Sequence, residues 1–161
     1  MKIINRALLF IPPAFTLKSE VDINPLPPLG LGYIAAVLQQ KGIEVKIVDA
    51  LMMGWNDRFD IKDDLIRIGL SFEDIRKIIS DFAPDMVGVN SLFTKQRNNA
   101  HEIFRLAKEV NPKTITVSGG AHPTVLPEMV LADENVDFAV LGEGENTILD
   151  ILKIIEGKND D

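Results

Sequence analysis

The 161-residue chain contains no cysteine and only two histidines, His101 and His122. Without cysteine the chain forms no disulfide, supplies no cysteine nucleophile, and holds neither a thiolate zinc site nor an iron–sulfur cluster. The two histidines are too far apart in the sequence to give a recognisable metal-binding spacing. We therefore expect no catalytic metal held by side chains of this chain.

Long apolar runs and an excess of positive charge are also missing. The longest purely apolar stretch, residues 7–14, is well short of the roughly 18 residues that indicate a membrane span. Residues 1–12 lack the charged start, apolar stretch and cleavage site of a signal peptide. The net charge of −7 excludes the basic footprint of a nucleic-acid-binding protein. These absences predict a cytoplasmic protein without a membrane span or a nucleic-acid partner.

What the chain does contain is a regular alternation of two patterns. Short apolar segments lie at residues 7–11, 45–48, 86–89, 115–117 and 138–141, and segments of helical periodicity lie between them. This is the pattern of βα units that feed a parallel sheet. We predict one α/β domain over residues 1–157, a flavodoxin-like (Rossmann-like) three-layer sandwich with a five-stranded parallel sheet in the order 2-1-3-4-5.

The predicted helices carry apolar stripes with clear boundaries. The stripes lie in residues 31–38, 75–82, 103–110 and 148–155. A capping box, Ser71-x-x-Asp74, opens the second helix, and Gly42, Pro84, Asn111-Pro112 and Gly157 are the stop signals. A further short helix is expected over residues 124–131.

Two segments interrupt this pattern. Residues 12–29 contain five prolines, which predict a long loop without regular structure after the first strand. Long loops inside compact domains are often functional. Residues 50–70 have a periodicity too weak to assign an element.

Ligands of an open parallel sheet bind outside the carboxyl ends of the strands, so the loops after the first, third, fourth and fifth strands are the candidate site. Gly119-Gly120 either lets a ligand approach the main chain or forms only a tight turn. Glu143 and Glu145 begin the last helix, where carboxylates are favoured as caps. His122 lies in a candidate loop, whereas His101 is interpreted as a solvated surface residue.

Two other ligand classes can be compared with these residues. The run Gly30-x-Gly32-x-x-Ala35, with Asp49 after the second strand, imitates a dinucleotide-binding fingerprint, but the proline-rich loop separates it from the first strand. A phosphoacceptor of the receiver type requires an aspartate after the third strand, where this chain has Asn90. An NAD- or flavin-binding domain remains the alternative interpretation.

Several short motifs occur in a fixed order along the chain. They are LGLGYIAA at residues 29–36 followed by GIEV at 42–45, PDMVGV at 84–89, GGAHPT at 119–124 and GEGE at 142–145. Together they resemble the cobalamin-binding domain at the N-terminus of many radical S-adenosylmethionine enzymes, over about residues 28–147. The carboxyl-edge loops and the resemblance together give ten cofactor-binding candidates: Asn90, Ser91, Leu92, Thr94, Gly119, Gly120, His122, Gly142, Glu143 and Gly144.

The resemblance also implies a division of labour. This domain would bind and orient cobalamin without catalytic residues of its own. A following domain of the same polypeptide, to which residues 158–161 would lead, would carry a 4Fe-4S cluster and S-adenosylmethionine. Methyl transfer and cyclisation are both compatible with such an arrangement.

One motif of the wider cobalamin-binding fold is missing. No Asp-x-His-x-x-Gly follows the first strand, because no histidine precedes His101. In the relatives that carry it, this histidine is the lower ligand of cobalt. We therefore expect base-off cobalamin without a histidine ligand. A domain that has lost its cofactor and serves as an interaction module is the other alternative.

Overall fold

The structure is a computed structural model that describes residues 2–19 and 27–157. The predicted tail at residues 158–161 lies outside the described residues, as do residues 20–26 of the predicted proline-rich loop.

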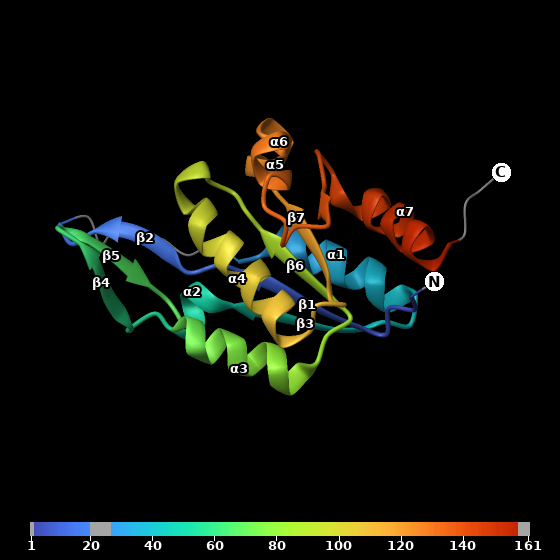
Figure 1. The fold of residues 1–161 in the computed structure, drawn as a ribbon, viewed down its shortest axis with the longest axis horizontal. Coiled ribbons are helices and arrows are strands. Elements are labelled where there is room, and N and C mark those ends of the chain that lie inside the picture. Colours follow the sequence, from blue (N-terminus) through green and yellow to red (C-terminus); the bar gives the residue numbers. More distant parts are fainter. Residues whose placement is uncertain (1, 20–26, 158–161) are drawn as a thin grey trace.

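The main sheet has five parallel strands in the order β3-β1-β6-β7-β8 (Figure 1). The strands are β1 (Arg6–Ile11), β3 (Glu44–Asp49), β6 (Met86–Asn90), β7 (Ile115–Gly119) and β8 (Phe138–Ala139). In chain order of these five strands the arrangement is 2-1-3-4-5, so the predicted parallel sheet is confirmed. The last strand is two residues long instead of the predicted four.

Helices cover both faces of this sheet and complete the predicted three layers. α1 (Leu29–Gln40) and α7 (Gly144–Glu156) pack on one face, and α3 (Phe72–Phe82) and α4 (Arg97–Val110) pack on the other (Figure 1). None of the helices in the described parts of the chain is long and apolar enough to cross a membrane.

Strand β1 shows how the core is divided between the two faces. Leu8 and Phe10 point into the cluster under α3 and α4, whereas Ala7 and Leu9 point into the cluster under α1 and α7. Because side chains alternate along a strand, a strand buried on both faces is apolar at every position. Removing a side chain such as Leu8, which is fully buried, would cost about 2–5 kcal/mol.

The predicted helix boundaries are confirmed where capping residues were identified. The Ser71 hydroxyl accepts a hydrogen bond from the Asp74 amide at 3.0 Å and opens α3. Helix α3 ends at Ala83, which is left-handed (φ 46°), directly before Pro84. At the far end of the chain, the Lys2 amide donates to the Ile155 carbonyl at 3.2 Å, which places the end of α7 at the amino edge of the sheet.

A second sheet corrects the prediction for residues 12–29. This antiparallel sheet has the order β2-β5-β4, formed by β2 (Ala14–Leu17), β4 (Arg58–Lys62) and β5 (Leu65–Ile68). The prediction of no regular structure is wrong for residues 14–17. Prolines 12 and 13 remove only their own amide donors, and the chain forms a strand directly after them because Ala14 pairs with Ile68.

Other segments also gain structure that the sequence did not assign. The unassigned residues 50–70 form the β4-β5 hairpin and the short helix α2 (Ala50–Met53). The short helix predicted over residues 124–131 is two helices, α5 (Ala121–Val125) and α6 (Pro127–Leu131). They separate at Leu126 because a residue before proline is disfavoured in the helical region.

Candidate functional site

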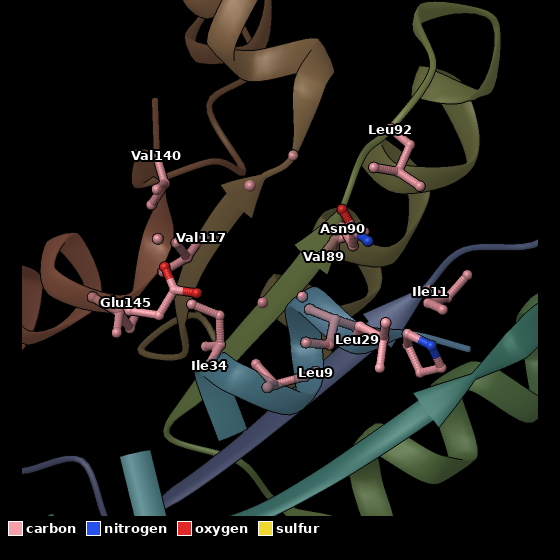
Figure 2. A pocket seen from close by; sticks show the side chains of 18 of the residues that line it. Leu9, Ile11, Leu29, Ile34, Val89, Asn90, Leu92, Val117, Val140 and Glu145 are labelled. Carbon is pink, nitrogen blue, oxygen red and sulfur yellow. The ribbon is translucent and has the colours of Figure 1, made fainter. Parts of the chain in front are cut away.

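A cavity of about 390 Å³ lies at the carboxyl ends of β1, β6 and β7, between the sheet and helices α1 and α7 (Figure 2). This volume is within the range of small-molecule sites. Its walls are mostly apolar and come from every adjoining element, including Leu9 of β1, Ile34 of α1 and Val117 of β7. Seven of the ten candidate residues line it: Asn90, Leu92, Gly119, Gly120, Gly142, Glu143 and Gly144.

The two glycines after β7 have different roles. A Cβ atom on Gly119 would meet no atom within 4 Å, so this position leaves open space at the cavity. Gly120 has φ 102°, and a Cβ there would lie 2.6 Å from the Asn90 Oδ1 atom and 2.8 Å from the Ser91 carbonyl oxygen. Gly120 therefore makes the tight turn, whereas the approach of a ligand at Gly119 stays a prediction.

The loop after β8 brings two acidic residues to the cavity. Glu143 is the N-cap residue of α7 and Glu145 lies in its first turn, but Glu143 makes no side-chain capping hydrogen bond. Both residues line the cavity, and Figure 2 shows the Glu145 side chain within it. Gly144 lets α7 pack against α1, because a Cβ there would lie 2.9 Å from the Ile34 Cδ1 atom.

The remaining candidates, Ser91, Thr94 and His122, lie behind the cavity wall. The His122 Nδ1 atom is 3.1 Å from the Thr94 hydroxyl, and the His122 amide donates to the Ser91 carbonyl at 3.0 Å. Burial, followed by the charges of His101 and Arg97, lowers the pKa of the His122 imidazole. These three residues hold the loops after β6 and β7 together and do not line the cavity.

The prediction that His101 is a solvated surface residue is wrong. Its Nδ1 atom lies 2.6 Å from a carboxylate oxygen of Asp133, and its side chain is only 22% exposed. Asp133 also accepts from the amide of Asn135, and these hydrogen bonds outweigh the effect of burial, so the pKa of the Asp133 carboxyl is lowered. His101 therefore joins α4 to the chain after α6.

The wall that α1 provides was not predicted from the sequence. Pro27, Pro28, Leu29 and Gly30 line the cavity at the start of this helix. The proline run followed by glycine was the available signal, since it ends the long loop at the carboxyl edge of the sheet.

The dinucleotide arrangement is not formed. Gly30 and Gly32 lie inside the first turns of α1 and not in the turn after β1. The Asp49 carboxylate caps α2 by accepting from the Met52 amide at 2.9 Å. No lysine or arginine lies among the described residues that line the cavity, so a pyrophosphate would find no cationic partner there.

Comparison with known families shows the family of the chain. Residues 23–152 match the family described as the B12 binding domain. The chain belongs to the B12-binding domain family. This match covers all the strands of the parallel sheet except β1 and includes every loop that lines the cavity after β6, β7 and β8.

Curated relatives of this B12-binding domain include enzymes. It is 44% identical over 136 residues to cytidylyl-2-hydroxyethylphosphonate methyltransferase of Streptomyces wedmorensis, covering 83% of this chain and 26% of the relative. It is 31% identical over 151 residues to the anaerobic magnesium-protoporphyrin IX monomethyl ester cyclase of Rubrivivax gelatinosus, covering 92% of this chain and 24% of the relative. The chain thus spans about a quarter of the length of these relatives.

A solved structure shares the fold. The B12-binding domain superposes on the cobalamin-dependent S-adenosylmethionine radical enzyme OxsB, solved with aqua-cobalamin and S-adenosylmethionine bound, with a TM-score of 0.67 and 19% identity. The superposition covers 99% of this chain and 20% of that chain. At this identity the likeness shows the fold alone.

Proposed function

We propose that this domain binds and orients cobalamin within a cytoplasmic radical S-adenosylmethionine enzyme of the methyltransferase or cyclase type. The observation that carries the proposal is the apolar cavity at the carboxyl edge of the sheet, with open space at Gly119, in a chain of the B12-binding family. A following domain of the same polypeptide would hold the 4Fe-4S cluster and S-adenosylmethionine, since this chain has no cysteine.

The cavity fits one part of cobalamin. A volume of about 390 Å³ with apolar walls suits the aromatic base of the nucleotide tail but is too small for the whole cofactor. The tail would enter beside Gly119-Gly120 and Asn90, and the corrin would lie over the carboxyl edge of the sheet. Leu92 and Phe93, which are 51% and 61% exposed at this edge, offer apolar contacts to the ring.

The residues present support binding without a histidine ligand. No histidine is among the described residues that line the cavity, and the His122 Nδ1 atom is engaged by the Thr94 hydroxyl. The imidazole is also almost completely buried, with 2% of the residue exposed. We therefore propose that the cofactor is held base-off, with its lower face against non-ligating residues or water.

Cobalamin, when bound, supplies organometallic group-transfer chemistry. The part of this chain is to bind the tail, fix the orientation of the ring and exclude water from its lower side. Each of these tasks falls to the glycine turns and apolar walls described above.

The proposal is tested by titrating hydroxocobalamin into the purified protein and following the visible spectrum through gel filtration. Retained cofactor is the expected result. Electron paramagnetic resonance of the cob(II)alamin form should show no superhyperfine splitting from an axial imidazole nitrogen. A splitting that disappears in His122→Ala would contradict the base-off proposal, and saturable binding of NAD or flavin in place of cobalamin would contradict the assignment as a whole. A domain that binds none of these would be an emptied interaction module.

A further inference from the structure

Glu145 is the feature of the cavity that the proposed function leaves unexplained. Its side chain points into the cavity near Ile34 and Val117 (Figure 2). The structure gives this carboxylate no hydrogen bond or ion pair with any described residue. The residue is only partly buried, and a donor or a positive charge that faces the carboxylate would stabilise it against these apolar walls.

The charge inside the cavity has one sign. Glu143 and Glu145 are the titratable residues among the described residues of its lining, and no basic side chain from β1, β6, β7 or α1 faces them. An anionic group deep in the cavity would be repelled, so the phosphate of a nucleotide tail must stay at the mouth. The inner occupant that matches this charge is an apolar ring that carries a proton on a ring atom.

We infer that the Glu145 carboxylate accepts a hydrogen bond from the protonated ring nitrogen of the cobalamin base, the same nitrogen that otherwise binds cobalt. The inference rests on the proposed cobalamin binding and assigns Glu145 as the residue that holds the base away from the metal. One proton, taken up from solvent, is shared between the carboxylate and the nitrogen. This chain has no histidine in the cavity to displace the base, so retention of the base in the cavity is what keeps it off the cobalt.

Three probes separate the parts of the cofactor. Cobalamin carries the ring nitrogen, a cobamide whose tail ends in a phenol ring lacks it but keeps the ribose, and cobinamide lacks the tail. Dissociation constants are measured by visible absorption for the wild type, Glu145→Gln and Glu145→Leu. Asn146→Leu is the control, because this neighbouring residue is exposed on the same helix and does not line the cavity.

We expect Glu145→Leu to weaken cobalamin binding by about tenfold to a hundredfold, the range for hydrogen bonds to charged groups. Binding of the phenolic cobamide and of cobinamide should not weaken, and Asn146→Leu should bind all three probes like the wild type. Thermal unfolding monitors whether each variant folds, and the isosteric Glu145→Gln keeps the test valid if the leucine variant does not.

The pH dependence gives a second readout. Above the pKa of the base nitrogen in unbound cobalamin, this nitrogen carries no proton, so binding must take one proton from solvent. The wild-type affinity for cobalamin should therefore fall by up to about tenfold per pH unit above that pKa. The slope should be absent in Glu145→Gln and absent for the phenolic cobamide.

Two results would overturn the inference in different ways. An equal loss of affinity for cobalamin and for the phenolic cobamide in the Glu145 variants would show that the carboxylate contacts the ribose or stabilises the helix and does not bind the ring nitrogen. A wild-type protein that binds none of the three probes would instead show that the proposed function has failed, and the role of Glu145 would fail with it.

Discussion

The Thr94 hydroxyl and the His122 Nδ1 atom lie 3.1 Å apart and join the loop after β6 to the loop after β7. The His122 Nε2 atom is buried and has no partner among the described residues, which favours the neutral imidazole. Both loops contribute to the cavity, so this contact fixes the relative position of two of its walls.

The buried imidazole makes stability depend on pH. Burial lowers the pKa of His122 in the folded state, so below the ordinary value near 6.5 the unfolded chain binds the proton more readily. The contribution of His122 to the free energy of unfolding is therefore fully present above about pH 6.5. It falls as the pH decreases toward the lowered pKa. Chemical denaturation between pH 7.5 and about pH 5 should show a shallower decrease for His122→Gln than for the wild type. An equal decrease in both proteins would contradict this explanation.

The two glycines after β7 should respond differently to substitution. Gly119→Leu adds a side chain where a Cβ meets no atom within 4 Å, so we expect folding close to wild type and loss of cobalamin binding. Gly120→Ala forces a Cβ against Asn90 at φ 102°, so we expect the free energy of unfolding to fall by about 1–3 kcal/mol. Thermal unfolding and cofactor titration separate the two effects. A Gly119→Leu protein that folds and binds cobalamin normally would rule out the proposed tail position.

Gln96 should protect the edge of the second sheet. Its side-chain amide accepts from the Phe15 amide at 2.6 Å and donates to the Phe15 carbonyl at 3.0 Å, in the manner of a neighbouring strand. In Gln96→Ala, hydrogen exchange at the Phe15 amide should accelerate by about tenfold, the effect of roughly 1.4 kcal/mol. The exchange rates of the β1 amides should be unchanged, and so should the rates of all amides in the control Gln39→Ala. Unchanged exchange at Phe15 would mean that the contact contributes no protection.

Gly32 and Gly42 form a matched pair for backbone effects. Neither would place a Cβ within 4 Å of another atom, but Gly32 lies in α1 whereas Gly42 has φ 80°. Gly32→Ala should raise the free energy of unfolding by about 0.5–1 kcal/mol, and Gly42→Ala should lower it by about 1–2 kcal/mol. Denaturant titration measures both, and cobalamin affinity should be unchanged in each. The same sign for both substitutions would contradict the conformational argument.

Local patterns predicted the parallel sheet because its strands are buried on both faces and its helices have wide apolar stripes. The second sheet was missed for a physical reason. Strand β2 gains its hydrogen bonds from β5, about fifty residues further along the chain, and such long-range pairing leaves no mark near Ala14. The alternation of charged and apolar residues in β4 was a usable signal that was not recognised.

The candidate site was predicted in part. The carboxyl-edge rule identified the loops that contain Asn90, Gly119 and Gly142, since it depends only on strand direction. Whether the His122 and Glu145 side chains point into the cavity or away from it depends on packing between loops far apart in the sequence. For that reason His122 was assigned to the site although it lies behind the wall, and Glu145 was interpreted only as a cap.

The end of α7, where the Ile155 carbonyl meets the Lys2 amide, sets a geometric requirement on any domain that follows. The cavity opens at the opposite edge of the sheet, and the 13-residue helix is about 20 Å long. A tether that returns along this height needs at least about six residues even when fully extended. With a shorter connector, a following domain would itself have to extend over this height to reach the cofactor.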